Sequence, residues 1–193
     1  MNKGKIFIIS GPSGSGKTTL YKKLLADPRY KERLVKTVSV TTRFPRPGEK
    51  HGRDYIFISK EQFLYRKRAG HFLESERVFD NYYGTPKKKV LGLLSQGKNV
   101  LLCIDVKGAR MVRRHFPKAI AIFIKTPSLA ILRKRLAGRG SEDKKAFELR
   151  LKIARKELLE APNYQHVVVN DDLSSTIRRL KSIVDKELYK NSL

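Results

Sequence analysis

Lys17 and Thr18 end the stretch Gly11-Pro12-Ser13-Gly14-Ser15-Gly16-Lys17-Thr18, which has the Walker A spacing G-x-x-x-x-G-K-S/T. Glycines allow the backbone N–H groups of such a stretch to curl around phosphate oxygens. We expect Lys17 to reach the β- and γ-phosphates of a nucleoside triphosphate and the Thr18 hydroxyl to hold Mg²⁺. The alternative is a glycine-rich turn without a ligand, and the lysine and the hydroxyl at the required positions argue against it.

Arg43 and Arg46 lie three residues apart on a loop rich in proline and glycine, residues 43–54. Two guanidinium groups held in this way suit a phosphate monoester, whose several oxygens accept bidentate hydrogen bonds. Tyr55 and Tyr83 can add phenolic donors to the same anion. The alternative for this loop is a solvated basic surface.

Glu74 interrupts a segment that is otherwise typical of an apolar strand. Alone it would be interpreted as an outward-facing strand residue, but together with Thr85 it is a candidate reader of a nucleobase. A carboxylate accepts from adjacent N–H groups such as guanine N1 and N2, and a hydroxyl can donate to O6. Such a site rejects a base that leaves its polar groups unpaired.

Short apolar runs alternate with helical patterns along most of the chain. This alternation predicts an α/β fold, a P-loop core in which helices cover both faces of a parallel sheet. Because ligands of such sheets bind beyond the carboxyl ends of the strands, we expect Gly11, Asp105 and Asn170 to lie at one edge. The strands predicted for this sheet are residues 5–10, 99–105, 119–124 and 166–170, of which 99–105 and 119–124 are expected to be buried.

Residues of about 37 to 88 are predicted to form an inserted mixed α/β lobe. Ser59 and Gln62 have the spacing of a capping box that opens a helix, and Gly70 ends that helix. Asn81–Pro86 is predicted to be a turn leading into a helix, with Pro86 at its first position. Residues 27–30 are predicted to be a break. The other segments expected are β-structure over 34–42, 55–58 and 72–79, and helices over 19–26, 106–115, 128–136, 141–159 and from 174.

The 193 residues carry a formal net charge of +25, from 43 Lys and Arg against 18 Asp and Glu. Such a surplus favours anionic partners, although scattered solvated lysines explain much of it. Cys103 is the only cysteine, which suits a reducing compartment. No apolar run approaches the ~20 residues that a membrane helix needs. The first predicted strand starts almost at once and leaves no room for a signal peptide, so we expect a cytoplasmic protein.

The run Thr41-Thr42-Arg43-Phe44-Pro45-Arg46-Pro47-Gly48-Glu49-Lys50-His51-Gly52-Arg53-Asp54-Tyr55-Ile56-Phe57 closely resembles the GMP-binding signature of guanylate kinases. Asn81–Thr85, Gly138-Arg139-Gly140 and Val169-Asn170-Asp171 match further landmarks of that family in the right order. The resemblance implies the reaction ATP + GMP ⇌ ADP + GDP with Mg²⁺. It also implies three parts, namely a core over 1–36, 89–134 and 153–193, a GMP-binding lobe over 37–88, and a lid over 135–152.

The family pattern assigns roles by position. The phosphate of GMP would be held by Ser39, Arg43, Arg46, Tyr55 and Tyr83. The guanine would be read by Glu74 and Thr85, with Gly84 beside them. The ATP-binding set would comprise Gly11, Pro12, Ser13, Gly14, Ser15, Gly16, Lys17, Thr18 and Thr19, with Arg135 and Arg139 from the lid and Asn170 and Asp171 near the adenine. Asp105 would organise Mg²⁺ together with Thr18, and would border the GMP site. We expect four cations to neutralise the moving charge, Lys17, Arg46, Arg139 and Arg150, and no protein nucleophile.

The chain departs from the family at Cys103, where an Asp-x-Asp pattern is usual and this sequence has Cys103-Ile104-Asp105. A neutral thiol is a poor acceptor, so one GMP contact is in question and dGMP, IMP or AMP become candidate acceptors. A kinase for another monophosphate is therefore one alternative. A non-catalytic guanylate-kinase-like interaction domain is a second, although such domains have typically lost the phosphate loop. A nucleic-acid-binding protein is a third, but the sequence has no matching motif, so we expect no specific nucleic acid as a partner. We also expect no membrane partner, and a monomer or weak homodimer.

Overall fold

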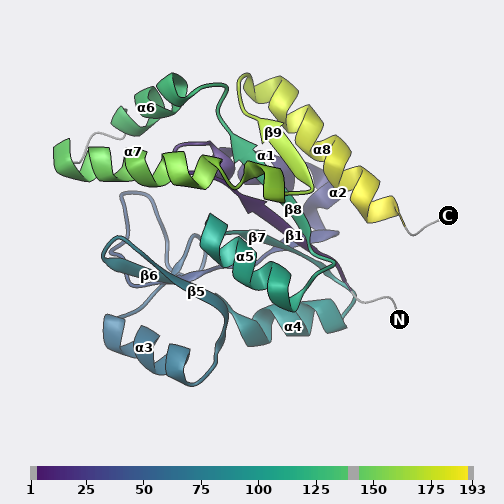
Figure 1. The fold of residues 1–193 in the computed structure, drawn as a ribbon. Helices are drawn as coiled ribbons and strands as arrows, with labels where there is room; N and C mark the ends of the chain where they lie inside the picture. The colour runs from purple at the N-terminus through teal and green to yellow at the C-terminus, as the bar shows by residue number, and fades with distance from the viewer. Residues whose placement is uncertain (1–3, 139–143, 191–193) are drawn as a thin grey trace. The chain divides into compact units, whose positions relative to one another are not determined.

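The computed structural model describes residues 4–138 and 144–190 and divides the chain into two compact units that each combine helices with strands (Figure 1). The strands predicted as solid apolar runs are present, and the chain has the expected α/β fold with parallel strands. The first unit comprises Met1–Ile6, Arg33–Leu102 and Lys107–Ala119, and the second comprises Phe7–Glu32, Cys103–Val106 and Ile120–Leu193.

The second unit is built on parallel strands. β1 (Ile6–Ser10) pairs with β8 (Ile120–Lys125), and β8 pairs with β9 (His166–Val169). Phe7, Ile8 and Ile9 are fully buried, as an unbroken apolar run predicts for a strand covered on both faces. Burial of this run makes β1 a fixed support for the glycine-rich stretch that follows it.

Helices complete the second unit. Figure 1 shows α8 lying beside β9, and α8 also packs against α1. A small apolar cluster, Leu132, Leu136, Leu151 and Ala154, joins α6 to α7. The helices are α1 (Lys17–Ala26), α2 (Pro28–Lys31), α6 (Leu129–Ala137), α7 (Lys144–Leu158), a short 3-10 helix (Ala161–Asn163) and α8 (Leu173–Tyr189).

Two polar contacts join α8 to the residues around α2. The Tyr30 hydroxyl donates to Asp185 Oδ1 at 2.8 Å, and Lys181 Nζ donates to Asp27 Oδ2 at 2.6 Å. Asp27 also caps α2, which stands where the sequence predicted only a break. Hydrogen bonds from Arg29 and then Lys181 hold the pKa of the Asp27 carboxyl well below its usual range.

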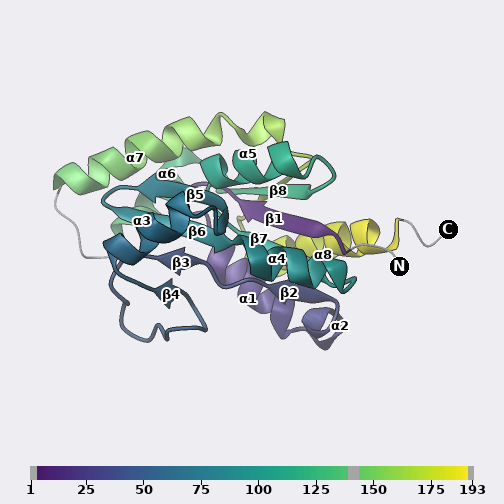
Figure 2. The same cartoon turned by 90° about the horizontal axis from the view of Figure 1, so that it is seen from below.

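The first unit contains a four-stranded sheet in the order β4-β3-β6-β5 (Figure 2). Its strands are β3 (Val40–Thr41), β4 (Ile56–Phe57), β5 (Phe72–Val78) and β6 (Asn81–Pro86). The predicted β-segment over 34–42 is two strands, because β2 (Leu34–Lys36) pairs with β7 (Asn99–Cys103) and β3 pairs with β4 and β6. The helices are α3 (Lys60–Arg68), whose predicted capping box is confirmed, α4 (Lys87–Ser95) and α5 (Val106–His115).

The predicted turn at Asn81–Pro86 is wrong, because these residues form strand β6. The chain reverses earlier, at Phe79, whose φ of 55° is left-handed. Tyr82 N–H donates to Thr42 Oγ1 at 2.9 Å, so pairing with distant residues overrides the local turn preference of this sequence. Pro86 is accordingly the cap before α4 and not its first residue.

The helices in the described ranges 4–138 and 144–190 include none that is long and apolar enough to cross a membrane.

Candidate functional site

The glycine-rich stretch links β1 to α1 in the second unit, as the Walker A spacing predicts. Gly11 has a φ of 134°, and a Cβ at this position would lie 2.1 Å from the backbone oxygen of Ile124 in β8. The loop therefore requires glycine at Gly11 both for its backbone conformation and for its close approach to the neighbouring strand.

Lys17 lies at the start of α1 and folds back over the loop. Its Nζ donates to the backbone oxygens of Gly11 at 2.6 Å and Pro12 at 2.9 Å. Thr18 and Thr19 follow in the first turn of α1, and both are exposed. The first turn of a helix presents N–H groups and a positive dipole end, so this turn suits an anion.

Asp105 follows β7, and its neighbour Ile104 donates its backbone N–H to Ile9 in β1 at 3.3 Å. Ile104 and Ile9 both belong to the second unit, so this bond aligns the residue just before Asp105 with the end of β1, the strand that carries the loop. Cys103 and Asp105 are both half-buried. The expectation that Asp105 and Gly11 share one strand edge agrees with this hydrogen bond.

Asn170 and Arg135 form a linked pair in the second unit. Arg135 Nη2, from α6, donates to the backbone oxygen of Asn170 at 3.1 Å. The side chain of Asn170 donates in turn to the backbone oxygen of Ser15 at 2.7 Å. Asp171, the next residue, is exposed. Asn170 therefore contacts the glycine-rich loop directly, and Arg135 contacts Asn170.

Arg150 lies on α7 in the second unit and is half-buried. Residues 139–143 of the expected lid, which include Arg139 and Gly140, lie outside the described residues. On the described part of α6 and α7, Arg133 approaches Glu148 at 3.7 Å and stacks 5.8 Å from the centroid of the Phe147 ring.

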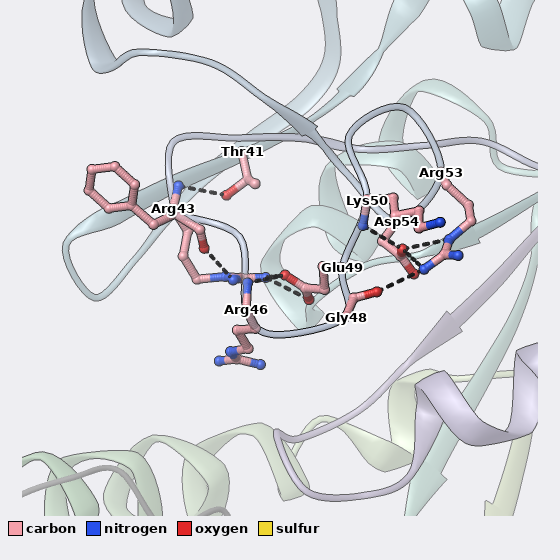
Figure 3. Close-up of polar contacts among 9 residues, drawn as sticks. Thr41, Arg43, Arg46, Gly48, Glu49, Lys50, Arg53 and Asp54 are labelled. Atoms are coloured by element: carbon pink, nitrogen blue, oxygen red, sulfur yellow. Dashed lines mark hydrogen bonds and ion pairs between the residues drawn. The ribbon is translucent and has the colours of Figure 1, made fainter.

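The loop that carries Arg43 and Arg46 is organised by Glu49 in the first unit (Figure 3). Arg43 Nη2 donates to both carboxylate oxygens of Glu49, at 3.0 and 2.9 Å, and Arg46 N–H donates to Oε2 at 2.9 Å. Figure 3 shows the Arg46 guanidinium pointing away from Glu49, and within the described part of the chain it makes no hydrogen bond. The loop thus fixes Arg43 and presents Arg46.

Aromatic rings surround the Arg43 guanidinium, which lies 5.5 Å from the Tyr55 ring centroid and 5.8 Å from that of Phe57. Tyr55 and Tyr83 pack edge to face with centroids 6.0 Å apart. Burial lowers the pKa of Arg43, and hydrogen bonds with Glu49 and Tyr83 raise it, so that the pKa stands above its ordinary value. Arg43 therefore stays cationic beside Tyr55 and Tyr83, the two residues predicted to offer phenolic donors.

Ser39 precedes β3, and its backbone oxygen accepts from Ile56 N–H at 2.9 Å. β3 pairs with β4 on one side and with β6 on the other. Ser39 therefore lies just before the strand between β4, which follows Tyr55, and β6, which contains Tyr83. The structure thus brings Ser39, Arg43, Tyr55 and Tyr83 onto neighbouring strands and the adjoining loop.

Glu74 and Thr85 face each other across β5 and β6. Both are buried, with Glu74 4% and Thr85 0% exposed, and Thr85 Oγ1 donates to Glu74 Oε1 at 2.5 Å. The outward-facing alternative for Glu74 is therefore wrong. Gly84 lies beside them, and a Cβ on it would come 2.9 Å from the Phe72 ring.

Sequence reasoning missed one side chain, Glu49, and one contact, that of Asn170 with Ser15, which hold these sites together. Glu49 has one usable signal in the sequence, because an acidic residue three positions after Arg46 and six after Arg43 can pair with either of them. The contact of Asn170 with Ser15 joins positions 155 residues apart, and no local pattern in the sequence predicts it.

Comparison with known proteins decides the family. A family model described as guanylate kinase matches residues 3–187. The chain belongs to the guanylate kinase family. It is 41% identical over 191 residues to a guanylate kinase of Rickettsia bellii, covering 99% of this chain and 98% of that protein. It is 43% identical over 192 residues to a guanylate kinase of Wolbachia sp. subsp. Brugia malayi, covering 99% and 97%.

The fold of this guanylate kinase family member agrees with a solved structure. The crystal structure of guanylate kinase from Anaplasma phagocytophilum superposes with a TM-score of 0.81 at 35% sequence identity. The match covers 99% of this chain and 89% of that one. The resemblance to guanylate kinases and the P-loop α/β fold predicted from the sequence are therefore confirmed.

The oxygen donors at this site suit a magnesium ion that arrives with a nucleotide. Thr18 offers an exposed hydroxyl and Asp105 a carboxylate, which are the hard ligands that Mg²⁺ prefers. Among residues 4–138 and 144–190, no three His, Cys, Asp or Glu side chains are grouped to hold a metal. Mg²⁺ commonly uses one or two protein ligands and takes others from phosphate and water.

Proposed function

We propose that the protein transfers the γ-phosphoryl group of ATP to GMP and produces ADP and GDP. The observation that carries this proposal is the buried pair of Glu74 and Thr85 in the same compact unit as the arginine loop. A carboxylate that accepts from N–H groups suits guanine, and two arginines near two phenols suit its 5′-phosphate. Membership of the guanylate kinase family supports the same reaction.

On the acceptor side, Arg43 would anchor the phosphate from its fixed position and Arg46 would follow the phosphate with its unengaged guanidinium. The phenols of Tyr55 and Tyr83 and the hydroxyl of Ser39 would complete the shell. Glu74 would accept from the guanine N–H groups, with Thr85 and Gly84 beside it. Adenine offers a different donor and acceptor pattern, so AMP would leave the buried Glu74 poorly paired.

On the donor side, the stretch from Gly11 to Thr19 would hold the phosphates of ATP. Lys17 would move from the loop carbonyls onto the β- and γ-phosphates, since an ammonium group prefers anionic oxygen to a neutral carbonyl. Asn170 and Asp171 would lie on the adenine side. Arg135, Arg139 and Arg150 would contribute cations from the lid, for which we propose residues 135–152.

Chemistry of this kind depends on alignment and on neutralising charge. Two anionic phosphates must come into line, so cations have to offset their repulsion, and Lys17, Arg46, Arg139 and Arg150 are the candidates. Bound Mg²⁺ would neutralise charge on the transferred group, and Thr18 and Asp105 would hold it. No side chain is needed as a nucleophile, because the GMP phosphate oxygen attacks directly.

Cys103 supports a second candidate, a kinase with relaxed acceptor choice. The family pattern has a carboxylate at this position, and a thiol accepts hydrogen bonds poorly. We propose dGMP as an additional acceptor on this ground. We further propose a core over 1–36, 89–134 and 153–193, a GMP-binding lobe over 37–88, a monomer or weak homodimer, and a cytoplasmic location where both nucleotides are abundant.

An acceptor panel tests the proposal. Purified protein is given ATP and Mg²⁺ with GMP, dGMP, IMP, AMP or UMP, and formation of ADP is followed in each. We expect GMP to be the best acceptor and Lys17→Ala to abolish turnover with the fold intact, while exposed Lys23→Ala serves as the matched control. Turnover with AMP or UMP that equals turnover with GMP would support the second candidate. A protein that binds ATP and ignores every acceptor would overturn both.

A further inference from the structure

Asn170 directly follows strand β9 and is almost completely buried, at 6% exposure. Its backbone N–H donates to the oxygen of Lys125 at 2.7 Å, and its backbone oxygen accepts from Arg135 Nη2 at 3.1 Å. Its side-chain Nδ2 donates to the backbone oxygen of Ser15 at 2.7 Å. Because the main chain is held on both sides, the position of the amide is fixed relative to the glycine-rich loop.

The same amide lies against Gly16. Gly16 has a φ of 91°, and a Cβ built on it would lie 2.2 Å from Asn170 Nδ2. That distance is far below any real contact, so the amide occupies the space that a side chain at position 16 would need. Glycine at this position is required by the amide as well as by the backbone.

The geometry of the peptide bond gives this contact a direction. In a trans peptide the carbonyl oxygen of one residue and the N–H of the next lie in one plane and point in opposite directions. The oxygen of Ser15 points to Asn170, so the N–H of Gly16 points the other way. Backbone N–H groups of such a loop are the donors that surround a phosphate.

We propose that Asn170 is a positioning residue, which fixes the Ser15–Gly16 peptide plane so that the Gly16 N–H faces the phosphates of the donor nucleotide. This role rests on the proposed function, because it assumes that the loop binds ATP. Arg135 supports Asn170 from α6 by its bond to the Asn170 oxygen. The role differs from recognition of adenine, since it concerns phosphate and is indifferent to the base.

Binding of two ligands separates these roles. Titration calorimetry is performed on the whole chain with ATP and with inorganic tripolyphosphate, which has no base. For Asn170→Ala we expect both ligands to bind about tenfold more weakly, because one oriented donor is lost. The Kd for GMP should stay within about twofold, since the GMP-binding residues proposed between Ser39 and Thr85 belong to the other unit. Asn163→Ala is the matched control, because Asn163 also donates a side-chain hydrogen bond, to Glu160 at 2.9 Å.

Asn170→Asp provides a second variant of nearly the same shape. Its ionised carboxylate cannot donate to Ser15, so it should weaken tripolyphosphate binding at least as much as the alanine does. Weaker binding of ATP with unchanged tripolyphosphate binding would overturn the proposal in favour of base recognition. Unchanged binding of both, or equal loss of GMP binding with a lowered melting temperature, would overturn it as well. Failure of the wild type to phosphorylate GMP tests the proposed function separately, because tripolyphosphate binding does not depend on the acceptor.

Discussion

Glu49 holds Arg43 through both of its carboxylate oxygens, at 3.0 and 2.9 Å from Arg43 Nη2. The same carboxylate accepts the backbone N–H of Arg46 at 2.9 Å. A single acidic side chain therefore sets the position of one arginine and the backbone of the other. An anion-binding loop gains from such a carboxylate because a positioned guanidinium binds phosphate better than a flexible one.

Replacing Glu49 by glutamine should raise the KM for GMP by about threefold to tenfold, since the amide loses the charged partner of Arg43. The KM for ATP should not change, and steady-state kinetics with each substrate varied in turn measures both. Asp80→Asn is the matched control, because Asp80 is 94% exposed and pairs only loosely with Arg77 at 3.4 Å. A lower KM for GMP in Glu49→Gln would show instead that the carboxylate mainly repels the substrate phosphate.

Thr85→Val should reduce kcat/KM for GMP by about tenfold, because the buried Glu74 carboxylate loses its donor at 2.5 Å. Thr85→Ser keeps the hydroxyl and should stay close to wild type. The ratio of kcat/KM for GMP to that for AMP is the decisive measurement, since it reports on base reading. Our assignment of this pair fails if valine and serine give the same ratio as the wild type.

Cys103→Asp should lower the KM for GMP and increase the preference for GMP over AMP, because a carboxylate accepts from guanine N–H groups and a thiol does so poorly. Cys103→Ser is the control, since serine adds polarity without charge. Kinetics with GMP, dGMP and AMP as acceptors measure the effect. Equal behaviour of the aspartate and serine variants would mean that residue 103 does not contact the acceptor.

Asp27→Asn should lower the melting temperature at neutral pH, because the carboxylate holds Arg29 and Lys181 at 2.9 and 2.6 Å. The pKa of Asp27 is lowered on folding, so its contribution to stability is present above the ordinary value of 3.8 and is lost as the pH falls below it. The difference in melting temperature between wild type and variant should therefore be steady from about pH 8 to about pH 5 and shrink below about pH 4. Thermal scans across that range check it, and a difference that grows in acid would contradict it.

Local patterns in the sequence predicted much of the fold. The buried run before Gly11 and the alternation of apolar runs with helical patterns depend on neighbouring residues, and they predicted β1, α1, β8 and β9 correctly. The capping box at Ser59 is likewise a contact between residues three positions apart, and it is present. Patterns that are complete within a few residues can be recognised in a sequence.

Contacts between residues far apart in the sequence determine the parts of the fold that local patterns did not predict. Asn81–Pro86 contains the residues of a turn, yet Thr42 and the facing strand β5 make it a strand. Glu74 lies between Leu73 and Ser75, a pattern that fits either face of a sheet, and only the structure shows that it is buried and pairs with Thr85. The candidate residues could thus be named from their types, whereas the side chains that orient them could not.

The hydrogen bond from Asn170 to Ser15 determines how late in translation the glycine-rich loop can reach its final conformation. All of the glycine-rich motif is translated within the first tenth of the chain, whereas the amide that lies against it comes 155 residues later. A nascent chain halted before β9 will carry the complete motif without the strand that supports it. The nascent chain should then begin to bind a nucleoside triphosphate abruptly, near the end of synthesis.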